Sequence, residues 1–428
     1  MEDLYASSAY KRSRTAYHMQ CAAEYLVSLL VADAFLAKLL KQIGLSDAVI
    51  GIVASLTSLA FLVQLATIFL MRHIRNVKRT VILIDSCSML CFLAVYLLPF
   101  FSVGQQLRSA LVFLTVGGGF LLRYLQLNLY YKWGNSFVRP EDRGTFSARN
   151  EAISLAVGVV FSLSIGAMVD RFERRGELSR SFLIIACVIA VLAVLNLILL
   201  LQIRPYSTED ALRQQKPFKE VVKNTLGNKS FRHVVIMVCL YDIGRYMTIG
   251  FLGTFKTQDL LLSVGTVQLI NITAHLMRCA FSRPAGKWAD RTSFAHVFRM
   301  GLWLCVVSYG LLIFTTPDTR WLIIGYTVLH NVAMAATGAN VNNMSYSYVP
   351  IDFFVQAQAV RSSIAGTLGF LASLVGSRIL TAVQAGGNRL LGRTVYGQQI
   401  LAAISLILTL TAIFYCRFIV EKQKVMKQ

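Results

Sequence analysis

The chain has 428 residues, of which 56% are hydrophobic and 15% are charged, and its mean hydropathy is +0.59. Because soluble domains carry about 25% charged residues, this composition excludes an ordinary soluble globular protein. The formal charge of +21 would suggest a nucleic-acid partner in a soluble protein. In a membrane protein, however, basic residues collect in the cytoplasmic loops.

Apolar runs of about 20 residues, the length that spans a bilayer as a helix, recur along the whole chain. The apolar residues, about 240 in all, could fill about twelve such helices. The sequence therefore predicts an all-α integral membrane protein with twelve transmembrane helices and no separate soluble domain. The predicted spans cover residues 20–42, 46–71, 80–101, 109–131, 150–170, 181–203, 233–254, 262–282, 296–315, 321–346, 360–383 and 398–420.

One long polar and basic connector separates the first six spans from the last six. We expect an N-terminal six-helix bundle over residues 1–203, a cytoplasmic linker over 204–232 and a C-terminal six-helix bundle over 233–428. After Pro217, apolar residues alternate with basic ones at helical spacing, which predicts a short helix at the membrane interface. Such a helix links the two halves, and a site for a regulatory partner is the alternative interpretation.

Basic residues concentrate in alternate loops. Placing both termini in the cytoplasm puts most of these loops on the inner face, which predicts a multi-pass plasma-membrane protein with anionic lipids at that face and no nucleic-acid partner. All eight cysteines lie in apolar stretches, so we expect neither disulfides nor a metal site. The inner-face basic residues are Arg72, Arg75, Lys78, Arg79, Lys132, Arg139, Arg143, Arg283, Lys287, Arg291, Lys422, Lys424 and Lys427, together with the basic connector.

A short motif follows the predicted span 262–282, where residues Gly286–Arg291 read GKWADR. It is similar to the Gly-x-x-x-Asp-Arg turn of the major facilitator superfamily, which the chain resembles over essentially its full length. Gly286 permits a tight turn, and Asp290 can accept backbone N–H groups or pair with an arginine. We expect Asp290 to pair with Arg149 at the start of span 150–170 and to stabilise an outward-open state.

The corresponding loop of the first half departs from this motif, because Leu70 and Ile74 stand where glycine and aspartate are expected. The departure indicates that the contacts that close the cytoplasmic side are asymmetric between the two halves. The resemblance implies two pseudo-symmetric six-helix bundles and transport by alternating access, in which one half rocks against the other.

Arg123 and Gln126 lie inside the predicted span 109–131 and are similar to the Arg-x-x-Gln pattern of the same superfamily. In the family, this arginine is linked to proton coupling or substrate binding. An arginine within hydrocarbon is costly unless it faces protein or water, so it is a candidate functional residue. A buried charge in a network that only stabilises packing is the alternative.

Other ionisable residues also lie within the predicted spans. Aligning the two halves brings Glu24 within one residue of Asp242, and a carboxylate that carries protons needs burial and neighbouring cations. Arg245 lies one helical turn after Asp242, so a mutual salt bridge is the alternative there, and interface anchoring is the alternative for Glu24. Asp33 is a further candidate. The ionisable residues within spans are Glu24, Asp33, Asp85, Asp242, Arg245, His275, Arg278 and His330.

Two substrate classes fit these spans. Amides such as that of Asn340, together with several tyrosines, suit a hydroxyl-rich solute. Arg123, Arg245 and Arg278 would instead suit a carboxylate or a phosphate through bidentate pairing. The residues leave both classes open.

We therefore predict a secondary active transporter that moves a small polar solute, a sugar or glycoside or an organic anion, by proton-coupled uptake. No enzyme activity, cofactor or metal is expected, and no phosphate-binding loop supports ATP-driven transport. The alternatives are a drug or metabolite efflux antiporter and a transport-incompetent receptor or scaffold. The expected solute-binding or proton-coupling residues are Asp33, Asp242, Arg123, Arg245, Arg278, Gln126, Asn340 and Glu24, and the conformational motif comprises Gly286, Asp290, Arg291 and Arg149.

Overall fold

The computed structural model describes residues 7–70, 74, 76–139, 142–205, 223, 225–349, 354–390 and 393–423. Most of the predicted interfacial helix after Pro217 lies outside the described residues, although Lys223 and residues 225–227 are described and helical. Arg72, Arg75, Lys424 and Lys427 also lie outside the described residues. The described residues are almost entirely helical, as the apolar runs predict.

Helices overlap each of the six spans predicted for the first half of the chain. The fourth is one long helix, in which a π-helical turn at Phe113–Gly117 joins α5 to α6. The helices are α1 (Ser8–Leu30), α2 (Asp33–Gln42), α3 (Asp47–Leu70), α4 (Val77–Leu97), α5 (Gln105–Val112), α6 (Gly118–Asn135), α7 (Arg143–Arg174) and α8 (Leu178–Gln202).

Helices also overlap the six spans predicted for the second half. A short antiparallel hairpin of β1 (Arg389–Leu390) and β2 (Arg393–Thr394) lies between the last two of them. The helices are α10 (Lys229–Ile249), α11 (Leu252–Thr254), α12 (Val264–Arg291), α13 (Phe294–Ile313), α14 (Leu322–Tyr348), α15 (Phe354–Ala385) and α16 (Gly397–Tyr415), with π-helical turns at Phe255–Asp259 and Cys416–Val420.

Nine helical segments of the described chain are long and apolar enough to cross a membrane, and Asp47–Val63 forms a shorter apolar helix. Large apolar side chains on these helices remain exposed, for example Val191 and Val194 of α8 and Val160 of α7. Helices that are apolar on their exposed faces are stable in lipid, where the backbone groups must be satisfied within the helix.

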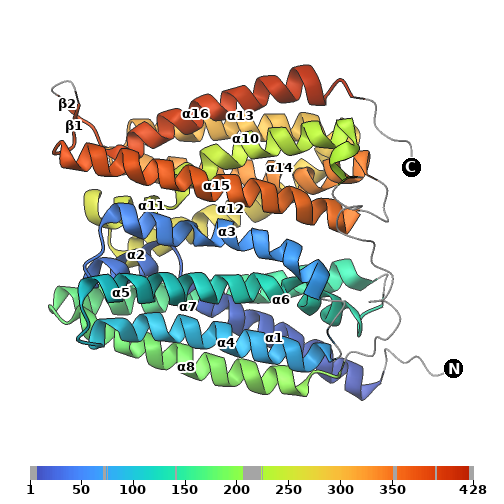
Figure 1. Cartoon of the computed structure of the whole chain (residues 1–428), viewed down its shortest axis with the longest axis horizontal. Coiled ribbons are helices and arrows are strands. Elements are labelled where there is room, and N and C mark those ends of the chain that lie inside the picture. The colour runs from blue at the N-terminus through green and yellow to red at the C-terminus, as the bar shows by residue number, and fades with distance from the viewer. Residues whose placement is uncertain are drawn as a thin grey trace. The chain divides into compact units, whose positions relative to one another are not determined.

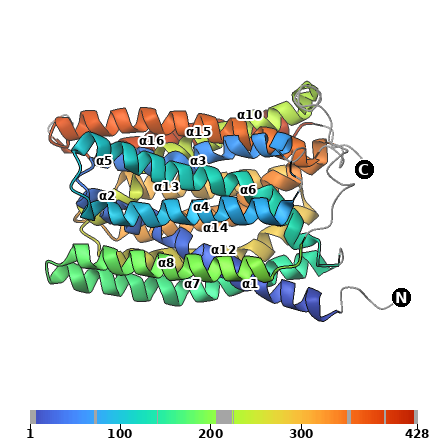
Figure 2. The same cartoon turned by 60° about the horizontal axis from the view of Figure 1, so that its bottom comes forward.

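The chain forms two compact units. Unit 1 comprises Met1–Leu45 and Ala66–Gln215, and unit 2 comprises Ser46–Leu65 and Lys216–Gln428. Within unit 1, α1 packs against α7 and α8, and α4 packs against α6 and α8, so that these helices run side by side (Figures 1 and 2). Within unit 2, α10 packs against α15 and α16, and α14 packs against α12 and α13.

The first part of α3 packs with unit 2, although its position in the sequence places it in the first half. A methyl group added at Gly366 of α15 would lie only 2.4 Å from the carbonyl oxygen of Ser58, so the two backbones are in close contact. Ser377 of α15 also donates a hydrogen bond to the carbonyl oxygen of Ala48 at 3.2 Å. Small residues at a helix interface allow this close approach.

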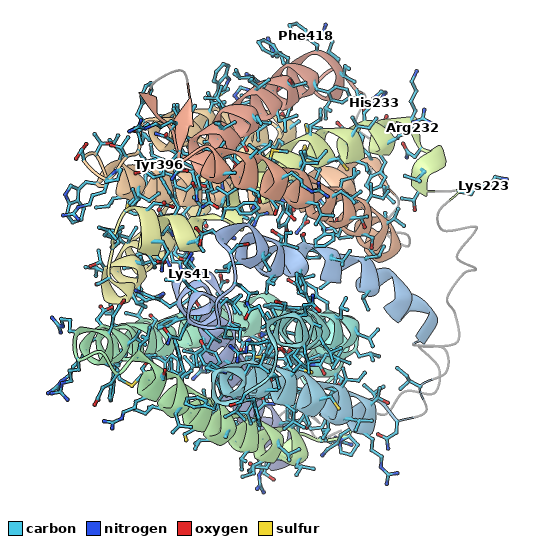
Figure 3. The ribbon with its side chains drawn as sticks, turned by 60° about the vertical axis from the view of Figure 1, so that its left-hand side comes forward. Lys41, Lys223, Arg232, His233, Tyr396 and Phe418 are labelled. Atoms are coloured by element: carbon cyan, nitrogen blue, oxygen red, sulfur yellow. The ribbon has the colours of Figure 1, made fainter. Side chains whose placement is uncertain are left out.

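The two ends of unit 2 are marked by different side chains. Figure 3 shows Arg232, His233 and Phe418 toward one end and Tyr396 toward the other. At the first end, the Nδ1 atom of His233 and the hydroxyl of Tyr415 lie 2.7 Å apart and share a hydrogen bond. This contact ties the beginning of α10 to the end of α16.

The first predicted span is broken, whereas its apolar run predicts one continuous helix. The break lies between Leu30 and Asp33, and Asp33 adopts a φ of 41°, in the left-handed region that residues other than glycine seldom adopt. Tyr96 of α4 donates a hydrogen bond to the carbonyl oxygen of Leu30 at 2.6 Å and so satisfies a group near the break. Asp33 begins α2, where the helix dipole favours a carboxylate.

Candidate functional site

An ion pair lies inside unit 1. Glu24 of α1 and Arg123 of α6 meet with 2.9 Å between Oε1 and Nε. Gln20, one turn earlier on α1, donates to the Oδ1 atom of Asn196 of α8 at 2.8 Å and to the Oε2 atom of Glu24 at 3.5 Å. The structure therefore brings together two residues that the sequence singled out separately.

Asp85 of α4 extends this arrangement. Its side chain is buried, with 2% of the residue exposed, and it accepts hydrogen bonds from Nε2 of Gln126 at 2.8 Å and from Nδ2 of Asn196. Asn196 thus connects Asp85 to Gln20 and onward to the ion pair. We refer to this hydrogen-bonded set as the unit 1 polar network, which comprises Gln20, Glu24, Asp85, Arg123, Gln126, Tyr130 and Asn196.

Unit 2 contains a cavity of about 190 Å³ between α10, α14, α15 and the side chain of Phe61. Asp242 and Arg245 of α10 line it one helical turn apart, with 3.6 Å between Oδ1 and Nη1. We refer to this cavity as the unit 2 pocket. Its polar lining comprises Tyr241, Asp242, Arg245, Tyr246, Thr337, Asn342, Arg361 and Ser362.

Arg361 of α15 gives this pocket its chemical character. Only 5% of the residue is exposed, and its Nη2 atom donates to the Oδ1 atom of Asn342 at 3.1 Å. Its Nε and Nη1 atoms are buried and have no hydrogen-bond partner within the described chain, and the same is true of Nε of Arg245. Two guanidinium groups therefore face one carboxylate, that of Asp242. Buried N–H groups without acceptors are costly, and a guanidinium fork matches a carboxylate or a phosphate.

Aromatic side chains form another part of the pocket. Tyr241 and Tyr246 are both largely buried there, and the guanidinium of Arg245 lies over the ring of Tyr246 at 5.1 Å from its centroid. Stacking of this kind orients a guanidinium and stabilises its charge. The pocket thus combines cationic groups with apolar ring faces.

Three predicted site residues belong neither to the unit 1 polar network nor to the lining of the unit 2 pocket. Asp33 begins α2 in unit 1. Asn340 is buried and donates to the carbonyl oxygen of Ala336 at 2.7 Å, which is a bond within its own helix. Arg278 is exposed on α12, although its Nη2 atom approaches Gly338 of the pocket lining.

The predicted conformational motif has a different local structure from the one expected. The sequence predicts a tight turn at Gly286, but α12 stays helical through Arg291 and ends at Thr292. A methyl group added at Gly286 would meet no atom of the described chain within 4 Å, so no close approach requires glycine there. Arg149 is exposed on α7 of unit 1. Its expected pairing with Asp290 would join one unit to the other and stays a prediction.

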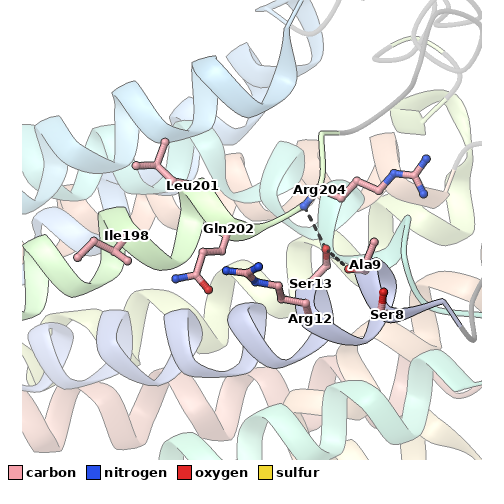
Figure 4. A pocket seen from close by; sticks show the side chains of 8 residues that line it. All are labelled: Ser8, Ala9, Arg12, Ser13, Ile198, Leu201, Gln202 and Arg204. Carbon is pink, nitrogen blue, oxygen red and sulfur yellow. Dashed lines mark hydrogen bonds between the residues drawn. The ribbon is translucent and has the colours of Figure 1, made fainter.

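A larger hollow of about 800 Å³ lies where α1 begins and α8 ends (Figure 4). Its edge is formed by Arg204, whose backbone N–H donates to Ser13 at 3.1 Å and whose guanidinium lies over the ring of Tyr10 at 4.7 Å. None of the predicted site residues lines it. Nor does the described part of the chain contain a group of three or more His, Cys, Asp or Glu side chains suited to a metal ion.

Three residues of these sites, Arg361, Asn342 and Asp85, are not among the principal site residues expected from the sequence. Arg361 stands at the edge of the predicted span 360–383, where an arginine resembles an interface anchor. Because α15 begins at Phe354, Arg361 lies about two turns inside the helix. The apolar pattern continues at helical spacing before Arg361, and this signal could have placed Arg361 inside the helix.

Comparison with known proteins identifies a protein family that matches the chain. The family model described as MFS/sugar transport protein matches residues 87–349. The chain belongs to this family. The resemblance to the major facilitator superfamily is therefore confirmed, and the protein is a membrane transporter and not an enzyme. Transporters of this superfamily work by alternating access. A search of curated proteins finds no match.

Solved structures of this fold agree with that assignment. The chain is similar to the nucleoside transporter NupG, with 12% identity, a TM-score of 0.70 and coverage of 98% of this chain and 100% of that one. A bacterial homologue of the human lysosomal transporter Spinster is 13% identical, with a TM-score of 0.70 and full coverage of both chains. A bacterial homologue of the iron transporter ferroportin is 12% identical, with a TM-score of 0.60 and coverage of 96% and 99%. The predicted all-α membrane fold is confirmed.

Proposed function

We propose that this transporter takes up a small organic anion together with protons, and that the anionic group binds in the unit 2 pocket. The observation that carries the proposal is the buried guanidinium of Arg361, whose Nε and Nη1 atoms have no acceptor among the described residues. A carboxylate or phosphate oxygen would supply those acceptors. It would also balance the second positive charge, because Asp242 can compensate only one of the two arginines.

Each polar residue has a role in this proposal. Arg361 binds the anionic group, and Asp242 orients Arg245 from one helical turn away. Tyr241 and Tyr246 cover the apolar faces of the solute, as ring faces do in sugar and nucleoside sites. The cavity volume of about 190 Å³ favours a small solute.

A neutral hydroxylated solute is the second candidate. Thr337 and Asn342 offer hydroxyl and amide groups beside the two tyrosine rings, and this combination suits a sugar or a nucleoside. The description of the family includes sugar transport, and NupG is a nucleoside transporter. The two candidates differ in whether the bound solute carries a negative charge.

A thermal-shift screen of the purified full-length protein separates them. The probes are matched pairs: glucuronate and glucose, uridine monophosphate and uridine, benzoate and benzamide. A ligand that binds the folded state at 100 times its Kd adds about 2.7 kcal/mol of stability. We expect the anion of at least one pair to raise the unfolding midpoint more than its neutral partner. Stabilisation by neutral partners alone would favour the second candidate.

Matched variants locate the binding site. Arg361→Gln should weaken anion binding roughly 10- to 100-fold, because hydrogen bonds to charged groups contribute about 1.5–3 kcal/mol. Arg180→Gln is the control, since Arg180 is exposed and pairs only locally with Glu177. Equal affinity in all three proteins would contradict binding at Arg361.

Proton coupling and location complete the proposal. In proteoliposomes, an inward proton gradient should drive accumulation of the anion found in the screen, and accumulation without a gradient would contradict the coupling. We propose that the protein lies in the plasma membrane with both termini cytoplasmic. Lys11, Arg14, Arg139 and Arg149 line a basic hollow in unit 1, which fits anionic lipid at an inner face.

A further inference from the structure

We infer that Asp85 is the proton-binding residue of the unit 1 polar network, and that it holds a proton while Glu24 is paired with Arg123. The inference names a site that the residue pattern did not favour, and it rests on the proton coupling proposed above. It follows from charge, burial and hydrogen bonding within unit 1.

The charges of the network balance only if one proton is added. Glu24 and Asp85 contribute two carboxylates, and Arg123 is the one cation among the seven network residues. Arg123 contacts Glu24 with 2.9 Å between Nε and Oε1. The compensating cation is therefore already engaged, and the surplus negative charge falls on Asp85.

The surroundings of Asp85 favour the protonated form. With 2% exposure, its carboxyl group is out of contact with water, and the two side chains that donate hydrogen bonds to it, those of Gln126 and Asn196, are neutral amides. A buried carboxylate without a cation is costly, and adding a proton removes that cost. The charged groups that face Asp85 from packed helices are Glu24 of α1 and Arg123 of α6, while α8 presents Asn196.

The network also contains a hydrogen-bond acceptor for the protonated carboxyl group of Asp85. The Oε1 atom of Gln126 is buried and has no donor among the described residues, although its Nε2 atom lies 2.8 Å from Asp85. A half turn of the amide group points Oε1 toward Asp85, whose O–H can then donate to it. The same carboxyl therefore finds a donor when it is ionised and an acceptor when it is protonated.

Infrared spectroscopy of the full-length protein in liposomes tests the inference directly. A protonated carboxylic acid has a carbonyl stretching band that an ionised carboxylate lacks. We expect the wild-type protein to show this band at neutral pH, Asp85→Asn to lose it, and the exposed control Glu177→Gln to keep it. A wild-type protein without the band, or a band retained in Asp85→Asn, would overturn the inference.

A second variant keeps the inference testable if Asp85→Asn does not fold. Gln126→Ala removes one hydrogen-bond partner of Asp85, so the frequency of the band should shift. An unchanged frequency would contradict the assignment. Because the protonated carboxyl and an amide have similar shapes and each can donate and accept, we expect Asp85→Asn to fold.

Transport separates this inference from the proposed function. Asp85→Asn should still bind the stabilising anion in the thermal-shift assay but lose its accumulation driven by a proton gradient. Undiminished gradient-driven accumulation in Asp85→Asn would overturn the role of Asp85. Failure of every anion to bind the wild-type protein would instead contradict the proposed solute class and leave the infrared band of Asp85 as expected.

Discussion

Both units place a partly buried arginine close to a carboxylate, but they do so in different ways. In unit 1, Glu24 and Arg123 come from different helices and lie 2.9 Å apart, and amide side chains extend the contact to Asp85. In unit 2, Asp242 and Arg245 share one helix and lie 3.6 Å apart, and Arg361 adds a second guanidinium.

The difference lies in the sign of the surplus charge and in what can compensate it. The unit 1 polar network has one carboxylate too many, and a proton, which needs no space, can neutralise it. The unit 2 pocket has one guanidinium too many and adjoining empty volume, so a larger anion can bind there. Two similar sets of polar residues thus suit two different ligands. Substitutions in the two units test this difference.

Arg123→Met should have the largest effect on stability. It leaves Glu24 as a buried carboxylate without its cation, and breaking a buried pair in this way costs about 3–5 kcal/mol. We expect a lower midpoint of thermal unfolding in detergent, followed by intrinsic fluorescence. Adding Glu24→Gln to this variant should recover much of the lost stability, because the second substitution removes the uncompensated charge of Glu24.

The control for Arg123 is Arg180→Met. Arg180 and Glu177 form an exposed pair at 2.7 Å, and such surface pairs contribute about 0–1 kcal/mol. Equal losses for the two variants would mean that the buried ion pair of unit 1 stabilises no more than a surface pair.

Gly366→Ala should have the next largest effect, and it tests the assignment of residues 46–65 to unit 2. The added methyl group would lie 2.4 Å from the carbonyl oxygen of Ser58, and overpacking of this kind costs about 1–3 kcal/mol. We expect a lower unfolding midpoint. Gly310→Ala is the control, because a methyl group there meets no atom of the described chain within 4 Å. An unchanged midpoint for Gly366→Ala would contradict the close packing of α3 and α15.

Arg361→Met should change stability little or raise it, in contrast to Arg123→Met. The substitution removes a buried charge whose Nε and Nη1 atoms lack partners in the described chain, so no ion pair is lost. We expect an equal or higher midpoint together with loss of anion binding. A loss of stability as large as that of Arg123→Met would show that groups of the protein itself already compensate the charge of Arg361.

A substitution of His18, which lies in the middle of α1 and before the first predicted span, should give the smallest effect. Burial lowers its pKa from 6.5, and the positive charge of Arg149 lowers it further, whereas the hydrogen bond with Asn150 opposes the shift. The unfolded chain therefore binds more protons than the folded one just below pH 6.5, so stability falls as the pH decreases through that range. His18→Gln should flatten this decrease in the unfolding midpoint. An identical pH dependence in both proteins would contradict it.

Much of the fold could be predicted because lipid imposes a simple rule: an apolar run of sufficient length is a helix. The break before Asp33 could not be predicted, because the tyrosine that satisfies the Leu30 carbonyl lies 66 residues away in the sequence. The packing of α3 with unit 2 also depends on contacts with Gly366 and Ser377, which are remote in the sequence.

The candidate site was predictable to the extent that its residues are local neighbours. Asp242 and Arg245 are one turn apart, and their spacing indicated the contact that the structure shows. Glu24 and Arg123 were each recognised as charges within apolar spans, but their pairing is a tertiary contact. Arg361 differs from an arginine at the membrane interface only in how far it lies from the end of its helix. That distance depends on the residue at which α15 begins.

The interruption between α1 and α2 has a mechanical consequence. A continuous helix transmits a displacement along its axis, whereas two helices joined by non-helical residues can change the angle between their axes. The second piece, α2, is anchored to α7 through Lys38 and Glu173, and the first piece, α1, carries Glu24. A displacement of α2 relative to α1 can therefore be absorbed at the joint between them.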